Sequence, residues 1–312
     1  MPSLKSRLFV LALKYRHLMR FQWKRRSFVT YDTSVPDLRK EIERGASFFG
    51  KLPKGMNIES VTIDAMHAEW VRPADASKDT AILYVHGGGY ATGSCAAHRA
   101  IVSKFANGAN TQALCFDYRL APEHPFPAAL DDAVSAYRWL LSEGYAPAKI
   151  AFIGDSAGGG LALATLIAAR DQGLPMPACA IAMSPWTDLT NSGDSWETNA
   201  QVDTLCWKEA QIVFADYYAR DNDRTNPWIS PLFGDLHGLP PIRIYVGGNE
   251  LLLSDSTRFA TKAADAGVDV KLEVGEGLFH CYPACAPLFP EATKALHEIC
   301  TFVKDRLPST RV

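Results

Sequence analysis

The sequence lacks the features that would assign the protein to a membrane, a metal or a nucleic acid. Its 312 residues contain no apolar run near the ~18 residues of a spanning helix. The apolar stretch LFVLAL is shorter than the roughly 7–15 residues of a secretory signal, and Lys14 and Arg16 interrupt the residues after it. CxxC and HExxH spacings are absent, and the net charge is only −2. We therefore expect a cytoplasmic protein with no metal, no cofactor and no nucleic-acid partner.

Cysteine is sparse, and its number is odd. The seven residues are Cys95, Cys115, Cys179, Cys206, Cys281, Cys285 and Cys300. An odd count without a secretory signal indicates reduced thiols rather than a disulfide framework. Cys95 comes shortly after a glycine-rich run, and Cys281 comes directly after a loop histidine. Modification of either thiol could therefore inhibit the protein, unless both are inert packing residues.

Negative charge is missing from the start of the chain. Eight basic residues precede the first acidic one, Asp32: Lys5, Arg7, Lys14, Arg16, Arg20, Lys24, Arg25 and Arg26. Such a segment can form an amphipathic helix at an anionic membrane surface, or a cap helix whose charges are solvated. We favour the cap helix.

From residue 58 onward, short apolar strands alternate with helices. After a strand pair at 58–73, runs such as AILYV (81–85), KIAFIG (149–154) and PIRIYVGG (241–248) are separated by helical segments. This alternation predicts an α/β protein with an eight-stranded, mostly parallel sheet covered by helices on both faces. Two segments interrupt it. We expect an N-terminal cap segment (1–50) and a cap insertion (189–228), with the core formed by 51–188 and 229–312.

The five residues GDSAG, at 154–158, lie between a predicted strand and a predicted helix. They match G-x-S-x-G, the nucleophile elbow, in which small neighbours leave the hydroxyl of Ser156 exposed above the sheet. The alternative is a glycine-rich turn with a capping serine. The run HGGG (86–89) after strand 81–85 favours the elbow, because the amides of Gly88, Gly89 and Ala157 could together form an oxyanion hole.

A nucleophilic serine needs a base and an acid that orients the base. We assign the base to His280, which lies in a loop after the last predicted strand, and the acid to Glu250, which follows the strand 241–248. Asp255 is the alternative acid, although it also suits the cap of the next helix. His86 and His98 flank the glycines and are expected to shape that loop.

Several longer strings resemble the bacterial hormone-sensitive-lipase-like (family IV) carboxylesterases of the α/β-hydrolase fold. They are HGGGY, DYRLAPEHPFPAALDDA (117–133), GDSAGG, SPWTDLT (184–190), SPLFGDLHGLPP (230–241) and GLFH. The resemblance implies a triad containing Ser156 and His280. It also implies that Gly87, Arg119, Glu123 and Asp155 support the glycine loop and the nucleophile. Where the family commonly has D-P-L-x-D/E, this chain has NELLLSD, so Glu250 takes the place of an aspartate.

The resemblance implies hydrolysis of short-chain acyl esters by a Ser-His-Glu triad. The alternatives are an amidase or arylacetamide-type deacetylase, a lipase that acts at membranes through the basic N-terminal segment, and a non-catalytic small-molecule binder on the same fold. The resemblance also implies a homodimer formed through the last strand, VDVKLEV (268–274), which is expected at a sheet edge. Membrane contact through the basic N-terminal segment is the less favoured alternative.

Overall fold

The computed structural model describes residues 2–19, 29–45 and 52–307, and its centre is one eight-stranded sheet. The strands are β1 (Met56–Ile63), β2 (Met66–Pro73), β3 (Ser77–Val85), β4 (Thr111–Phe116), β5 (Ile150–Asp155), β6 (Cys179–Met183), β7 (Ile242–Gly247) and β8 (Val270–Gly275). Their order across the sheet is β1-β2-β4-β3-β5-β6-β7-β8.

Most neighbouring strands run parallel. β1 pairs with β2, and β2 with β4, in antiparallel registers, whereas every pair from β4 to β8 is parallel. The central strands β4, β5 and β6 are buried along their whole length, as expected for strands covered on both faces. The predicted fold class is confirmed.

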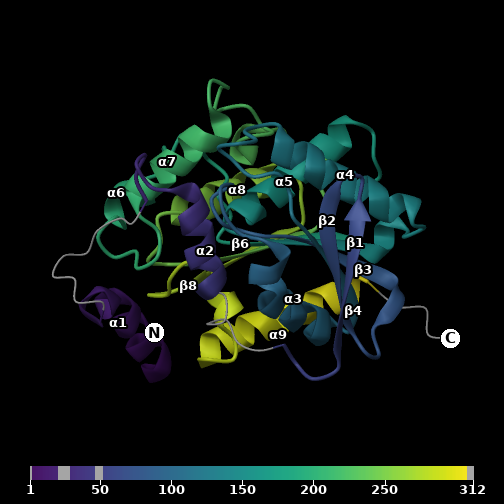
Figure 1. Ribbon diagram of the computed structural model, residues 1–312, viewed down its shortest axis with the longest axis horizontal. Coiled ribbons are helices and arrows are strands. Elements are labelled where there is room, and N and C mark those ends of the chain that lie inside the picture. The colour runs from purple at the N-terminus through teal and green to yellow at the C-terminus, as the bar shows by residue number, and fades with distance from the viewer. Residues whose placement is uncertain (1, 20–28, 46–51, 308–312) are drawn as a thin grey trace.

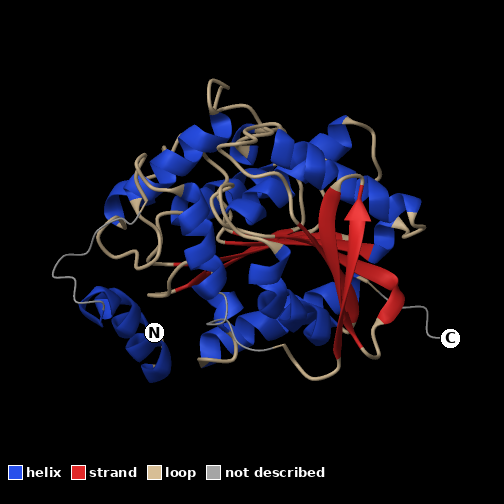
Figure 2. Cartoon of the chain, in the orientation of Figure 1, coloured by secondary structure: helices blue, strands red, loops and turns tan. Residues whose placement is uncertain are grey.

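Helices cover both faces of the sheet (Figures 1 and 2). On one face lie α4 (Ala128–Ser142), α5 (Ala157–Asp171) and α8 (Leu253–Asp265); on the other lie α3 (Cys95–Ala109) and α9 (Pro290–Arg306). Short 3-10 turns are η2 (Pro147–Lys149), η3 (Pro231–Phe233) and η4 (Tyr282–Cys285).

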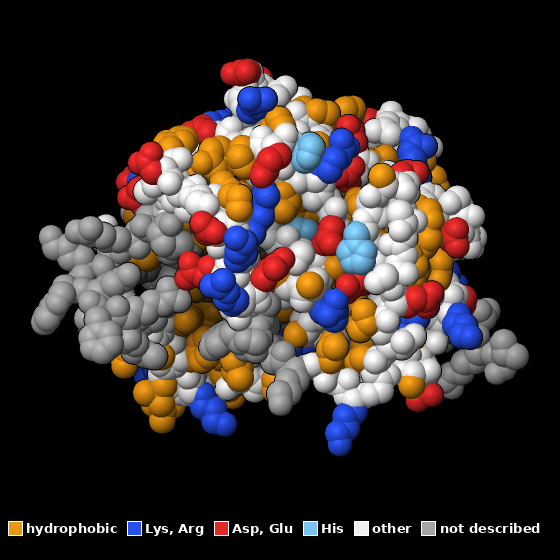
Figure 3. All heavy atoms as spheres, in the orientation of Figure 1, with side chains coloured by type: hydrophobic (Ala, Val, Ile, Leu, Met, Phe, Trp, Pro, Cys, Tyr) orange, Lys and Arg blue, Asp and Glu red, His pale blue; other side chains and the backbone are white. Residues whose placement is uncertain are grey.

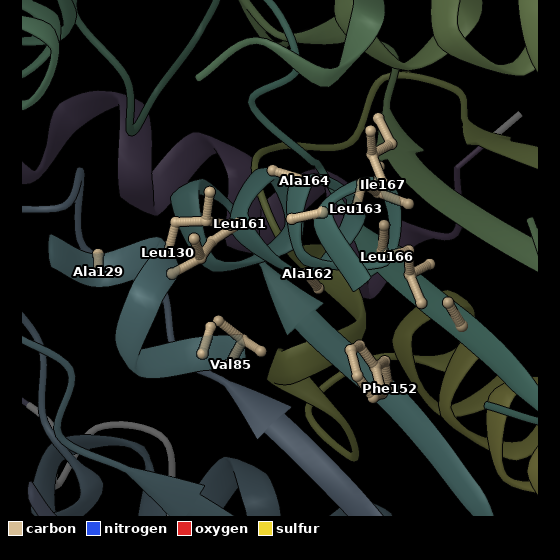
Figure 4. Close-up of a cluster of buried hydrophobic side chains, with 14 of the residues drawn as sticks. Val85, Ala129, Leu130, Phe152, Leu161, Ala162, Leu163, Ala164, Leu166 and Ile167 are labelled. Carbon is tan, nitrogen blue, oxygen red and sulfur yellow. The ribbon is translucent and has the colours of Figure 1, made fainter. Parts of the chain in front are cut away.

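The larger core lies between the sheet and the α4, α5 and α8 layer. In Figure 4, Val85 lies on a strand below Leu130 and Leu161 of the helices, and Phe152 lies on a strand below Leu166. A second core lies under the sheet, between the opposite strand faces and the helices α3 and α9. The parallel strands are thus fixed from both sides, and their carboxyl ends meet at one edge, where ligands bind in such sheets.

The remaining helices come from the two segments that interrupt the alternation. They are α1 (Leu4–Met19), α2 (Val35–Gly45), α6 (Ser195–Thr198) and α7 (Lys208–Ala219). Leu38 of α2 packs against Ala210 and Val213 of α7, so two segments far apart in sequence share a small core. Phe9 of α1 instead contacts the core beside α9.

The described helices and cysteines bear on the expectations about membrane spans and disulfides. In the described ranges, no helix has both the length and the apolar character needed to cross a bilayer. All seven cysteines are free thiols, as the odd count predicts.

The packing predicts a large difference between buried and exposed strand positions. Phe152 on β5 is fully buried and meets Tyr137 of α4 edge to face, with ring centroids 5.0 Å apart. We expect Phe152→Ala to lower the free energy of unfolding by about 3–5 kcal/mol, because it leaves a cavity. Val274→Ala, at an exposed position of β8, should cost no more than about 1 kcal/mol. Urea denaturation followed by circular dichroism measures both, and equal losses would contradict the prediction.

Candidate active site

Ser156 lies at the sharp turn between β5 and α5. Its backbone has φ 55° and ψ −126°, a left-handed conformation that is strained for a residue with a side chain. A Cβ on Gly158 would lie 2.2 Å from the carbonyl oxygen of Val85, and one on Gly154 would lie 2.4 Å from that of Gly158. Glycine is therefore required at both positions. The turn places Ser156 at the N-terminus of α5, where the helix dipole favours negative charge.

The glycine loop follows β3 and is held by the residue next to the serine. The Gly87 amide donates to Asp155 Oδ1 at 3.0 Å, and the Tyr84 hydroxyl donates to the same oxygen at 2.8 Å. Burial alone would raise the pKa of Asp155, but His98, 3.7 Å from its other oxygen, acts together with the Tyr84 hydroxyl, and the pKa is lowered. Asp155 is thus kept as a charged acceptor that fixes the glycine loop against the elbow.

Three backbone amides remain available at this place. Gly88 and Gly89 have φ 124° and 62°, which turn the loop back on itself. In the described part of the chain, the amides of Gly88, Gly89 and Ala157 donate to no carbonyl or side chain. Buried amides are nearly always paired, so three unpaired donors beside a serine at a sharp turn suit an anionic ligand.

His280 and Glu250 are in direct contact. His280 Nδ1 lies 2.7 Å from Glu250 Oε2, and the Glu250 side chain is fully buried. The other carboxylate oxygen, Oε1, accepts from the Ser184 hydroxyl at 2.7 Å and from the Gly247 amide. The buried carboxylate therefore has three donors, which fix its orientation toward the imidazole.

The surroundings of His280 favour the protonated ring. Burial lowers the pKa of the imidazole, but the groups beside the ring, the Glu250 carboxylate among them, act more strongly in the opposite direction. The net pKa lies well above the ordinary value of 6.5. A proton taken up by this ring is therefore stabilised by the site.

Two hydrogen bonds link the backbone of Ser156 to the loop that carries His280. The Ser156 amide donates to the Met183 carbonyl at 2.8 Å. The hydroxyl of Ser184, which follows Met183, accepts from the Cys281 amide at 2.9 Å. Among the described residues, the Ser156 hydroxyl and the His280 ring share no hydrogen bond. Catalytic hydrogen bonds are often long before substrate binds, so the absence of this bond is compatible with a catalytic pair.

Asp255, the alternative acid, lies elsewhere. Its Oδ1 accepts from the amides of Thr187 and Asp188, both at 2.9 Å, and its side chain is fully buried. Burial raises the pKa of Asp255 well above its usual range. Its contacts hold the segment after β6, whereas the contact with His280 is made by Glu250.

Glu123 and Arg119, both in the YRLAPEHP stretch, form ion pairs with different parts of the protein. Glu123 forms a two-pronged pair with Arg39 of α2, at 2.9 and 2.7 Å, and Arg39 also donates to the Ala91 carbonyl just beyond the glycine loop. Arg119 instead binds Asp132 of α4. The expectation that Arg119 braces the glycine loop is therefore corrected: its guanidinium points to a carboxylate one helical turn into α4.

The two histidines beside the glycines differ: His98 pairs with Asp155, whereas His86 is a packing residue. His86 stacks on Tyr118, with ring centroids 4.2 Å apart, and lies 5.2 Å from the His98 ring. Burial, helped by His98, lowers the pKa of His86 to about 3. A neutral, stacked ring at the base of the loop supports the loop's shape and takes no proton near neutral pH.

The two thiols singled out in the sequence have raised pKa values. Burial raises the pKa of both Cys95 and Cys281, and Cys95 is almost completely covered. Thiolate is the reactive form, so these surroundings favour inert packing residues.

Ser184, Asn199 and Asp203 contribute to the site and were missed in the sequence. Asn199 Nδ2 donates to the Glu250 carbonyl at 3.0 Å, and Asp203 accepts from the amides of Leu251 and Cys206. Asn199 and Asp203 belong to the insertion, which thus holds the loop that carries Glu250. Only Ser184 has a sequence signal: it is the polar residue that ends a buried strand.

The side chain of Phe214 on α7 lies against the glycine loop. Its ring atoms come within 2.5 Å of the position that a Cβ on Gly89 would occupy. Glycine is therefore needed at 89 for space as well as for its positive φ. The insertion places an aromatic ring directly beside the unpaired amides.

One group of possible metal ligands occurs in the described ranges. Ligand atoms of His67, Cys95 and Asp117 lie within 4.8 Å of one another. Asp117 already accepts from the Cys95 amide at 2.6 Å, and His67 lies 3.4 Å from Glu69. Because these partners account for the group, we assign no ion to it, and the absence of a metal remains a prediction.

Comparisons with known proteins show the family to which the chain belongs. A family model described as the alpha/beta hydrolase fold matches residues 82–284. An acetyl-hydrolase of Streptomyces hygroscopicus is 39% identical over 291 residues, 93% of this chain and 94% of the relative. A crystal structure of EstE5, soaked with p-nitrophenyl butyrate, superposes with a TM-score of 0.90 at 39% identity, covering 98% of this chain and 99% of that one.

A second solved structure carries a more specific description. It is an esterase from the bacterial hormone-sensitive lipase family, with a TM-score of 0.89 and 38% identity over 98% of this chain and 99% of that one. The chain belongs to the alpha/beta hydrolase family, and within it to the bacterial carboxylesterases that resemble hormone-sensitive lipase.

Proposed function

We propose that the protein hydrolyses short-chain acyl esters, with Ser156 as nucleophile, His280 as base and Glu250 as the acid that orients the base. The observation that carries this proposal is the 2.7 Å contact between His280 Nδ1 and the buried Glu250 carboxylate. With Nδ1 donating to Glu250, the other ring nitrogen, Nε2, is left to accept a proton.

The reaction is acyl transfer to water in two halves. Nε2 of His280 takes the hydroxyl proton as Ser156 Oγ bonds to the ester carbonyl carbon, and the imidazolium then protonates the leaving alcohol as the C–O bond breaks. Water repeats the sequence on the acyl-enzyme, which releases the carboxylic acid and restores Ser156. Glu250 stabilises the imidazolium without taking its proton.

The negative charge that forms on the carbonyl oxygen is assigned to the amides of Gly88, Gly89 and Ala157. Their unpaired state and the N-terminus of α5 support this role, because preorganised donors need no rearrangement during the reaction. Loss of one such donor typically lowers the rate by about 10²–10³-fold.

The preference for short acyl chains is supported by Phe214. Its ring lies against Gly89, where the acyl part of a bound ester would begin. Crystals of the similar EstE5 were soaked with p-nitrophenyl butyrate, so this ester of a four-carbon acid is a suitable probe.

Substitution of the carboxylates separates the two candidate acids. We expect Ser156→Ala to lower kcat for p-nitrophenyl butyrate by ~10³-fold or more, and Glu250→Gln to lower it by about 10²–10⁴-fold through loss of the charge beside His280. Asp255→Asn should retain far more activity than Glu250→Gln, because Asp255 contacts backbone amides. Steady-state kinetics on variants with wild-type circular dichroism provide the measurement. A larger loss in Asp255→Asn would assign the acid to Asp255.

The raised pKa of His280 predicts the pH dependence. The base must be unprotonated, so kcat/KM should decline as the pH drops through the His280 pKa, with a midpoint above about 6.5. In Glu250→Gln the residual activity should show this midpoint at lower pH, since a negative neighbour that favours the imidazolium is gone. An unchanged midpoint in that variant would mean that Glu250 does not act on the titrating base.

The position of Phe214 predicts a change in chain-length selectivity. Phe214→Ala should raise kcat/KM for p-nitrophenyl octanoate relative to butyrate by about tenfold, because room opens beside the glycine loop. Tyr217→Ala is the matched control on the same helix, since its ring contacts Tyr31 with centroids 6.4 Å apart. A similar shift in both variants would indicate general loosening of α7.

A further inference from the structure

Helix α1 is attached to the protein along one face. Phe9 stacks on Phe279 and also meets Phe289, with ring centroids 5.4 Å apart in both cases. Ser3 and Ser6 both hydrogen-bond to the carboxylate of Glu291 at the start of α9. These contacts fix which side of α1 faces the body of the protein.

The opposite face of α1 is also apolar. Leu4, Leu8, Leu11 and Tyr15 have exposed fractions of 73%, 58%, 50% and 45%. Their spacing of four, three and four residues places them in a single stripe on a helix with 3.6 residues per turn. Lys5, Arg7 and Lys14 are exposed as well, as expected for solvated charges, so this side of α1 carries an apolar stripe in addition to its charges.

Positive charges border this stripe. At 3.6 residues per turn, Lys5 lies along one edge of the stripe, whereas Arg7 and Lys14 lie along the other, and α1 contains no acidic residue. Hydrophobic side chains gather at the lower left of Figure 3, where Figure 1 places α1. An apolar stripe between basic edges is the arrangement by which a helix lies in the plane of an anionic lipid surface.

We propose that the outer face of α1, formed by Leu4, Leu8, Leu11 and Tyr15, docks on anionic lipid bilayers. The leucines enter the boundary between headgroups and acyl chains, and the bordering lysines and arginine contact lipid phosphates. The occupant is a lipid surface rather than a second copy of the chain, because a copy would bring the same positive charges against this one.

The docking face is close to the chemistry. The inner side of α1 rests on Phe279, the residue before His280. One layer of side chains therefore separates the lipid-facing helix from the loop that carries the proposed base. A protein docked in this way holds its ester site near the bilayer, where apolar esters concentrate.

Sedimentation with vesicles tests the proposal on the full chain. We expect the wild type to bind phosphatidylcholine vesicles that contain phosphatidylglycerol, and to bind pure phosphatidylcholine at least ~10-fold more weakly. Leu8→Glu should reduce binding to the anionic vesicles at least ~10-fold, because a charge replaces an inserted apolar side chain. Lys5→Gln combined with Lys14→Gln should weaken binding to the anionic vesicles alone.

Ile212→Glu is the matched control. Ile212 is an exposed apolar residue of another helix, α7, so it receives the same change of charge on a surface outside the proposed face. It should bind as the wild type does. Hydrolysis of soluble p-nitrophenyl acetate should be unchanged in Leu8→Glu, which shows that the variant is folded and keeps the lipid result independent of the proposed function.

Three results would overturn the proposal. One is wild-type binding that is equal for anionic and neutral vesicles, and another is equal binding by Leu8→Glu and the wild type. The third is a change from dimer to monomer in Leu8→Glu, seen by light scattering after gel filtration, which would assign the stripe to self-association.

Discussion

The site depends on a single carboxylate that is completely removed from water. A buried charge is costly unless donors surround it, and Glu250 has three: the His280 ring, the Ser184 hydroxyl and the Gly247 amide. Each donor comes from a different part of the sheet edge, after β8, after β6 and at the end of β7 respectively. The carboxylate therefore joins three connections into one rigid group, and the position of the imidazole follows from it.

The parts of the site that are formed by residues close together in the sequence could be predicted from the sequence alone. The elbow around Ser156 requires small residues at fixed offsets, and the glycine loop requires positive φ angles directly after a strand, so both can be recognised in a short window. Glu250 and His280 can be predicted together because polar residues just beyond parallel strands meet at one edge. Their contact in the structure agrees with that reasoning.

Contacts between distant segments could not be predicted in this way. Arg39 reaches Glu123 and the Ala91 carbonyl across more than 50 positions, and Asp203 reaches Leu251 across 48. Nothing in the local sequence distinguishes Arg39 from the other charges of its helix. Arg119 shows the opposite case: a motif suggested a partner, and a nearby carboxylate, Asp132, binds it instead.

β8 is the edge strand beyond β7, and the loop that follows it carries His280. An edge strand has one hydrogen-bonded neighbour, and every residue of 270–275 is either half-buried or exposed. The proposed base is thus held by one of the least protected strands of the sheet, while the proposed nucleophile is held by a fully buried one. Thermal inactivation and loss of the sheet can therefore be separate events, with the edge fraying first and the serine still in place on an intact core.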